Sequence, residues 1–245
     1  MSYLSETRMI LGMPVDVFPS YASAAETVRG RVSAGARTFC VAMNPEKLYR
    51  ARRDAKLAEI LKRADMRICD GVGLSLASRI LHGSAMPRCT GVDLFLTLIA
   101  LAEERQWSIF LLGASPEANA GACRELKRRF PALRIAGARD GFFSASDDVI
   151  ATINESGADL LFVAMGSPRQ EFWIAEHRSA LRTAFCMGVG GSLDVLAGVA
   201  KRAPAIFRKT GTEWLFRLLS DPRRARRQIA LPLFAWEVLK SALNH

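Results

Sequence analysis

Two successive strand-to-helix units decide the fold: Asp159-Leu-Leu-Phe-Val-Ala-Met165 with Gly166-Ser-Pro-Arg-Gln-Glu171, and Ala184-Phe-Cys-Met187 with Gly188-Val-Gly-Gly-Ser192. In each unit an apolar run of strand length ends at glycine and polar residues, and a helical pattern follows. The backbone N–H groups at the start of such a helix favour anions, phosphate above all. In an open α/β sheet these turns lie at the carboxyl ends of the strands, where ligands bind. The sequence therefore predicts a site for a phosphorylated small molecule.

The same alternation of strand-like and helix-like segments extends over the rest of the chain. Short apolar runs separated by helical patterns occur at residues 38–43, 66–69, 108–112, 133–137, 159–165 and 184–187. Parallel strands buried on both faces read as continuous apolar runs, and helices connect them. We therefore predict an α/β fold, with a Rossmann-like, mostly parallel sheet flanked by helices. Residues 1–200 are expected to form this domain, and residues 201–245 a C-terminal helical appendage.

Composition limits the classes of protein that this chain can represent. Its 245 residues are 50% hydrophobic and 24% charged, which is typical of a globular protein. The N-terminus lacks the pattern of a signal peptide, and no apolar run approaches the ~20 residues that span a bilayer. The three histidines form no cluster, and the five cysteines show no metal-ligand spacing, which favours a reducing, cytoplasmic compartment. We interpret three of these cysteines, Cys40, Cys69 and Cys186, as small apolar residues of buried strands, with Cys89 left open.

Positive charge is concentrated in the last fifth of the chain. The net charge is +10, and residues 201–245 contribute ten basic and three acidic side chains to it. Thr212 can cap a helix, and apolar side chains follow on one face and beyond it: Trp214, Leu215, Leu218, Leu219, Ile229, Leu231, Leu233, Phe234 and Trp236. A solvated basic helix and a nucleic-acid-binding segment are the alternatives. We favour a segment that meets anionic lipid headgroups, because basic residues beside aromatic ones suit that interface.

Polar residues follow several of the predicted strands. Asp70 comes after the strand at 66–69, Asn44 after the strand at 38–43, and Phe142 lies on the turn after the strand at 133–137. Asp70 is either a turn residue or a general base at the carboxyl edge of the sheet. Arg88 either binds a phosphate or carboxylate there or forms a surface ion pair. Phe142 places an aromatic ring where a nucleobase can stack.

Seven short motifs occur in a fixed order along most of the chain. They read Asn44-Pro-Glu, Ala64-Asp-Met-Arg-Ile-Cys-Asp70-Gly-Val-Gly, Arg88-Cys-Thr-Gly-Val-Asp-Leu, Asp140-Gly-Phe-Phe, Ala164-Met-Gly-Ser-Pro-Arg-Gln-Glu171, Gly188-Val-Gly-Gly-Ser-Leu-Asp194, and Lys201-Arg-Ala-Pro204 with Glu213-Trp-Leu-Phe-Arg217. Together they resemble the WecG/TagA/CpsF family of bacterial envelope glycosyltransferases. The resemblance implies an inverting enzyme that moves a sugar from a UDP donor to a sugar on a polyprenyl diphosphate lipid.

The resemblance also assigns roles to individual residues. It implies that Asp70 is the catalytic base and that Arg88 is an active-site arginine. Residues that would contact the donor are Asn44, Gly141, Phe142, Gly166, Gln170, Gly190, Gly191 and Asp194. Three arginines of the appendage would fold over the site and meet the diphosphate: Arg217, Arg224 and Arg227.

Several expectations follow about donor, cofactor and location. The resemblance is nearest to the branch that transfers N-acetylmannosaminuronic acid, with N-acetylmannosamine or glucose as alternative sugars. Ala42 replaces a threonine found in some members, which leaves the donor open, whereas Arg169 keeps the charge of a frequent lysine. No Asp-x-Asp motif is present, so we expect no cofactor and no required metal, with arginines and helix N-termini stabilising the leaving UDP.

We expect the enzyme to attach peripherally to the inner face of the cytoplasmic membrane through residues 201–245, without binding nucleic acid, and a small homo-oligomer is possible. Two other classes of protein stay open. A dinucleotide-dependent oxidoreductase is disfavoured because no G-x-G-x-x-G opens a helix. A non-catalytic, basic membrane-associated adaptor would tolerate replacement of Asp70.

Overall fold

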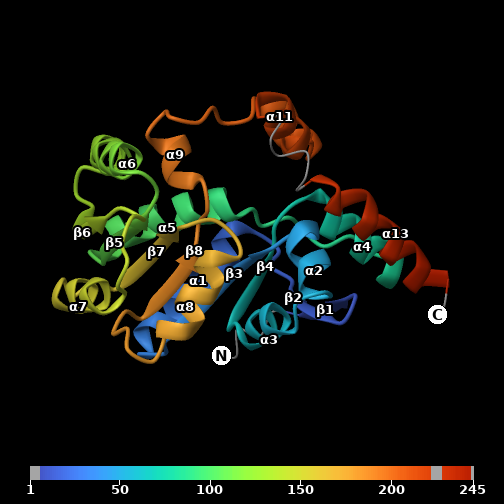
Figure 1. The fold of residues 1–245 in the computed structure, drawn as a ribbon, viewed down its shortest axis with the longest axis horizontal. Helices are drawn as coiled ribbons and strands as arrows, with labels where there is room; N and C mark the ends of the chain where they lie inside the picture. Colours follow the sequence, from blue (N-terminus) through green and yellow to red (C-terminus); the bar gives the residue numbers. More distant parts are fainter. Residues whose placement is uncertain (1–5, 222–227, 244–245) are drawn as a thin grey trace.

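A single mixed sheet organises the protein. The computed structural model describes residues 6–221 and 228–243. Within them eight strands form one sheet in the order β1-β2-β4-β3-β8-β7-β5-β6, parallel except for β1, which pairs antiparallel with β2 (Figure 1). The strands are β1 (Thr7–Ile10), β2 (Met13–Asp16), β3 (Thr38–Met43), β4 (Met66–Cys69), β5 (Ser108–Gly113), β6 (Arg134–Arg139), β7 (Leu160–Ala164) and β8 (Phe185–Gly188). This arrangement confirms the predicted α/β fold.

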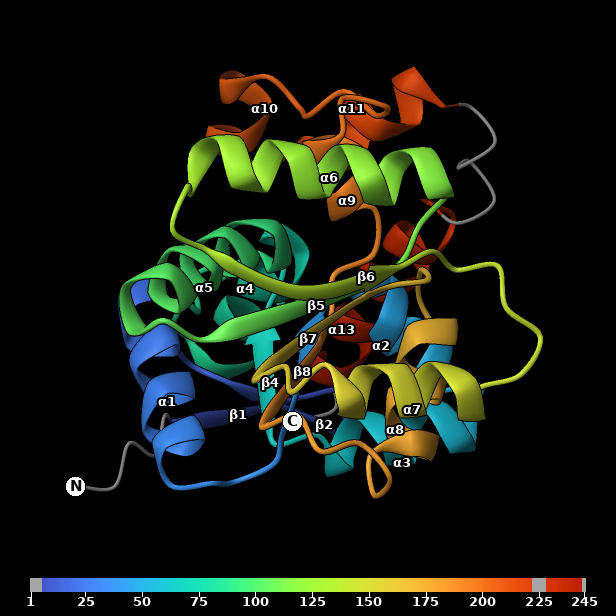
Figure 2. The same ribbon diagram turned by 90° about the vertical axis from the view of Figure 1, so that its left-hand side faces the viewer.

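Helices cover both faces of the sheet (Figure 2). One face carries α2 (Pro45–Ala51), α3 (Ala55–Arg63), α4 (Val72–His82), α7 (Asp147–Glu155), α8 (Arg169–His177) and α13 (Ala230–Leu243). The other carries α1 (Tyr21–Ser33), α5 (Gly91–Arg105), α6 (Pro116–Arg129) and α9 (Ser192–Leu196). Two further helices, α10 (Ala205–Thr210) and α11 (Glu213–Ser220), lie on the same side of the molecule as α9 (Figures 1 and 2).

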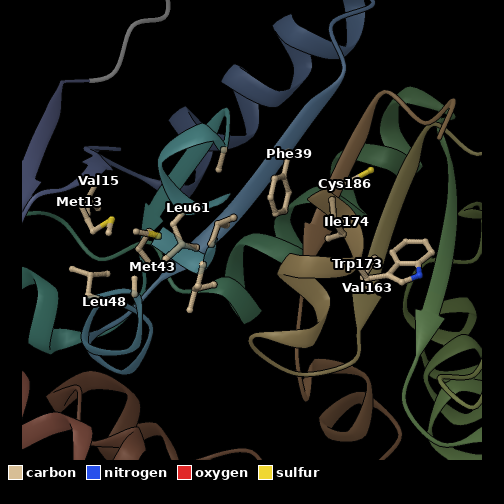
Figure 3. Packing of buried hydrophobic residues seen from close by; sticks show 14 of the residues in the cluster. Met13, Val15, Phe39, Met43, Leu48, Leu61, Val163, Trp173, Ile174 and Cys186 are labelled. Atoms are coloured by element: carbon tan, nitrogen blue, oxygen red, sulfur yellow. The ribbon is translucent and has the colours of Figure 1, made fainter. Parts of the chain in front are cut away.

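The apolar core is divided into two layers by the sheet. In β3, Phe39, Val41 and Met43 belong to one buried cluster, whereas Cys40 and Ala42 belong to the other. This alternation follows from the pleat, which points successive side chains to opposite faces. Figure 3 shows part of the first layer, which includes Met43 and Leu48. Because the central strands are buried on both faces, they read as continuous apolar runs, as the sequence indicated.

The hairpin of β1 and β2 was not predicted. Its strands have only four residues each, and they include the charged Arg8 and Asp16 as well as Pro14, which a central strand does not tolerate. The pairing of β2 with β4 is short, with Asp16 opposite Ile68. A short edge of this kind gives no sustained apolar or alternating pattern.

The C-terminal helix packs on the body of the protein. Helix α13 contacts α2 and α4. Its Phe234 and Val238 are buried in the core layer that also contains Met43. Its Glu237 also forms ion pairs with Arg52 (2.7 Å) and Arg53 (3.2 Å). The expectation that Phe234 contributes to an exposed apolar surface is therefore wrong, because its side chain is only 3% exposed. The division into two domains at residue 200 stays a prediction.

Candidate functional site

The carboxyl ends of the parallel strands bring the predicted site residues to one edge of the sheet. Asn44 follows β3, Asp70 follows β4, Gly166 is in the turn after β7, and Gly190 is in the turn after β8. After β3 the chain enters α2 on one face, and after β8 it enters α9 on the other. Adjacent strands whose connections leave to opposite faces create the crevice in which α/β proteins bind ligands. The site is therefore expected between the ends of β3 and β8.

Backbone hydrogen bonds at this edge join the segments that carry Asp70 and Arg88. The Asp70 N–H donates to the carbonyl of Met43 (2.7 Å), and the Cys89 N–H donates to the carbonyl of Cys69 (2.9 Å). These two bonds hold the turn after β4 against β3 and against the segment that carries Arg88. The Asp70 carboxylate also accepts a hydrogen bond from the N–H of Gly91, the first residue of α5 (3.4 Å). A partial positive charge at a helix start favours the ionised carboxylate.

The two cysteines beneath this pair are core residues. Burial, with a smaller contribution from the neighbouring Asp70 carboxylate, raises the pKa of the thiols of Cys69 and Cys89 to about 12 each. The positive charge of Arg88 acts to lower the pKa of the Cys69 thiol, but burial outweighs it. Neither thiol is ionised near neutral pH, and both are about 1% exposed. The question that the sequence left open for Cys89 is therefore answered in favour of a structural role.

A close contact between helices sets the approach to Asp70. A side chain at Gly73, in the first turn of α4, would place its Cβ 2.5 Å from Cγ of Pro45 at the start of α2. Only glycine allows α4 and α2 to begin this close together. Asn44 caps α2, its Oδ1 accepting from the N–H of Lys47 (2.9 Å). The two helix starts that flank the ends of β3 and β4 are thus fixed relative to each other.

Gln170 is buried at the start of α8, and its side chain reaches the turn that follows β8. Its side chain is 3% exposed, and its Oε1 accepts from the N–H of Gly190 (3.0 Å). Its Nε2 donates to Oε1 of Glu171 (3.1 Å). Gln170 and Gly190 are therefore brought together, as expected of residues that share a ligand.

A buried ion pair lies beside Gln170, and sequence reasoning did not predict it. Lys47 Nζ donates to Glu171 Oε1 (2.8 Å) and to the carbonyl of Ala42 (2.7 Å). The two charged side chains are 3% and 1% exposed. Burial would raise the pKa of Glu171, but the Lys47 charge and the hydrogen bonds to the carboxylate outweigh it and lower that pKa. The Glu171 carboxylate is therefore ionised near neutral pH.

Phe142 stands apart from the other candidates. Its ring is 79% exposed on the turn after β6, where its N–H donates to Oδ1 of Asp140 (2.8 Å). The N–H of Gly141 donates to the carbonyl of Ala114 (2.9 Å), which joins this turn to the end of β5. Because β6 is three strands from β8, about 14 Å separate the two strands. An extended ligand is needed to reach both.

The last predicted donor contacts lie on and before α9. Gly191 immediately precedes this helix, and Asp194 is in its first turn. A Cβ on Gly191 would lie 3.6 Å from Oδ2 of Asp194. The carbonyl of Asp194 accepts from the N–H of Ala200 (3.0 Å), so the same residue also ties α9 to the segment that follows.

The segment after α9 returns to Arg88. Arg202 forms an ion pair with Asp93 of α5, and Ala203 is buried. Gly211, between α10 and α11, has φ +75°, and a Cβ there would lie 2.5 Å from Nη1 of Arg88 and 2.7 Å from Cβ of Val72. The α10–α11 segment thus lies against Arg88. The side chain of Arg217 and all of Arg224 and Arg227 lie outside the described residues, so their roles stay predictions.

Comparison with known proteins identifies the family of this chain. The model of the glycosyl transferase WecG/TagA/CpsF family matches residues 8–245. Curated relatives named N-acetylglucosaminyldiphosphoundecaprenol N-acetyl-beta-D-mannosaminyltransferase are similar over most of their length. The protein of Bacillus spizizenii is 36% identical over 90% of this chain and 85% of its own. Those of Bacillus subtilis and Staphylococcus aureus are 33% and 35% identical, over 82% and 83% of this chain and 79% and 80% of their own. The chain therefore belongs to the WecG/TagA/CpsF family and is a glycosyltransferase.

Proposed function

We propose that the protein transfers a sugar of the N-acetylmannosamine type from a UDP donor to N-acetylglucosamine carried on a polyprenyl diphosphate, with inversion. The observation that carries the proposal is the similarity to three relatives named for an N-acetylmannosaminyl transfer to such an acceptor. N-acetylmannosaminuronic acid is the sugar that the motif of residues 164–171 indicated, and both sugars belong in the test. UDP-glucose is the remaining alternative.

In the proposed reaction Asp70 takes the proton of the acceptor hydroxyl. The freed oxygen attacks the anomeric carbon of the donor sugar while the bond from that carbon to the UDP oxygen breaks on the opposite face. One base at the edge of the sheet is sufficient for this displacement. The position of Asp70 supports the role, because its carboxylate follows the end of β4 and is stabilised in the ionised form by Gly91 N–H.

The departing UDP develops negative charge, which fixed donors can stabilise. Arg88 and the starts of the helices that follow β7 and β8 supply such donors at the same edge. We propose that the arginines of the appendage complete this set, with Arg88 already in contact with Gly211 of that segment. The enzyme then needs no divalent cation, and Phe142 is proposed to stack on the uracil.

The acceptor lipid places the reaction at a membrane surface. Within residues 6–221 and 228–243, none of the helices combines the length and apolar composition that crossing a bilayer requires. We propose a peripheral contact with the inner face of the cytoplasmic membrane. Large apolar side chains of the C-terminal region support it, since these are between 47% and 69% exposed: Leu219, Ile229, Trp236 and Leu239. Basic residues at 223–227 add attraction to anionic lipid.

The proposal is tested by following UDP release with a short-chain prenyl-diphosphate N-acetylglucosamine acceptor. UDP-N-acetylmannosamine, UDP-N-acetylmannosaminuronic acid and UDP-glucose are compared, each with and without EDTA. Asp70→Asn should abolish release while the protein stays folded and still binds UDP. Asp65→Asn is the matched control, because Asp65 is an ion-paired carboxylate near the opposite ends of β3 and β4. Release that persists in Asp70→Asn would contradict the assigned base, and no UDP binding by the wild type would overturn the function.

A further inference from the structure

We propose that the buried pair Lys47–Glu171 positions the donor-sugar site, by fixing the orientation of the Gln170 side-chain amide and the end of β3. Neither residue was among the predicted site residues, and neither contacts the ligand in this proposal. The inference rests on the proposed function, because it concerns how strongly the donor is held.

The pair connects three of the predicted donor contacts. Lys47 is the third residue of α2, and its backbone N–H holds the side chain of Asn44. Its ammonium group reaches the carbonyl of Ala42, the residue before the last of β3. Glu171 Oε1 accepts a hydrogen bond from Nε2 of Gln170. At the other end of the same amide, Oε1 of Gln170 accepts a hydrogen bond from the N–H of Gly190. A single chain of hydrogen bonds therefore runs from Asn44 to Gly190 beneath the carboxyl edge.

The carboxylate decides which way the Gln170 amide points. A glutamine amide has a donor end and an acceptor end of nearly equal size, so packing alone does not distinguish the two orientations. Glu171 in its ionised form only accepts, which requires the Nε2 end to face it. Oε1 must then face the Gly190 N–H. In the flipped orientation two donors would face each other at Gly190 and two acceptors at Glu171.

The space around Gln170 leaves this side chain little freedom. The last residue of β8, Gly188, has no side chain, and a Cβ there would lie 2.7 Å from Cδ of Gln170. The amide is thus seated directly over the end of β8. A buried ion pair is costly to remove from water and is weak evidence for stability. Its place between two helix starts at the site favours a role in orientation.

The experiment compares a double variant, Lys47→Met with Glu171→Leu, with the wild type and with Asp65→Asn. An apolar pair of similar volume commonly preserves or raises stability, so the double variant should unfold in urea near the wild type. Its KM for UDP-N-acetylmannosamine and the Kd of the same donor by calorimetry should rise about tenfold, the loss of roughly one oriented hydrogen bond, with kcat changed less. Asp65→Asn should leave both constants unchanged.

Two further variants separate the possible outcomes. Gln170→Ala should raise KM similarly, and combining it with the double substitution should add little, because both remove the same oriented amide. If the double variant does not fold, Glu171→Gln takes its place, since it keeps the shape and removes the acceptor-only end. A folded variant with wild-type KM and Kd overturns the positioning role. A wild type that binds neither UDP nor the donor instead overturns the proposed function.

Discussion

Replacing Gly211 by alanine tests whether the α10–α11 segment must lie against Arg88 for catalysis. The new Cβ would stand 2.5 Å from Arg88 Nη1 and 2.7 Å from Val72 Cβ, both well inside normal contact. The residue would also keep a left-handed backbone at φ +75°. The steric overlap and the left-handed backbone both destabilise the position of the segment against Arg88. Their free-energy costs can be measured separately.

Gly83→Ala isolates the backbone part of this cost. Gly83 also has φ +75°, at the end of α4, and a Cβ there would meet nothing within 4 Å. A left-handed alanine costs about 1–2 kcal/mol at either position. At Gly211 the collision adds about 1–3 kcal/mol. Ile206 and Leu219 of the segment are 67% and 69% exposed, so these two large side chains contribute little to holding it against that excess. It should therefore move away from Arg88 before the core changes.

The equilibrium constant for docking of the segment in Gly211→Ala should then fall roughly 5- to 150-fold relative to Gly83→Ala, which is what 1–3 kcal/mol produces. The assay is initial-rate UDP release in the presence of acceptor, with urea unfolding on the same samples. We expect kcat of Gly211→Ala to fall by up to that factor, with an unfolding midpoint close to that of Gly83→Ala. Equal activity of the two folded variants would refute the reasoning, since only one of them carries the collision.

Three further predictions concern single groups. Phe142→Ala should weaken UDP binding by calorimetry about 5- to 150-fold, since one stacked base is worth about 1–3 kcal/mol, and a stable but fully binding variant would exclude stacking. Glu171 has a lowered pKa in the folded protein, so the stability that its carboxylate contributes is fully present above pH 4.5 and is lost as the pH falls through the folded pKa. The urea midpoints of wild type and Glu171→Gln should therefore converge below pH 4.5. A difference that stays constant with pH would contradict this. Cys69 and Cys89, each with a raised pKa of about 12, should resist alkylation until the protein unfolds, as mass spectrometry of native samples would reveal; rapid native labelling would refute their burial.

The strands of the sheet were predictable to the extent that they are buried. Residues 38–43 and 66–69 were predicted with the observed bounds, because both runs are apolar and end at polar turns. β6 begins and ends later than predicted, and its side chains alternate between exposed and half-buried at the edge of the sheet. Its boundary is set by pairing with β5 rather than by an apolar run. The hairpin of β1 and β2 depends in the same way on a partner that the local sequence does not reveal.

At the site, the residues next to strand ends were predictable and those between elements were not. Asn44, Asp70 and Gln170 follow strands directly, so topology alone brings them to one edge. Lys47 and Glu171 are 124 residues apart, and each reads as an ordinary charge in the first turn of a helix. The buried position of Phe234 was missed for a similar reason, since an amphipathic helix shows an apolar stripe whether protein or lipid covers it.

The segment that carries α10 and α11 is anchored at both of its ends. Ala203 is buried before it, and Ala230 is buried after it in a helix that packs on α2 and α4. A chain held at two points explores far less space than a free tail, so much of the entropy of bringing it to the active site is already lost on folding. If the arginines of the appendage act at the site as proposed, this double attachment gives them a high effective concentration near Arg88. Removal of α13 would leave the segment attached at one end, and the entropy of bringing it to Arg88 would then be lost in every catalytic cycle.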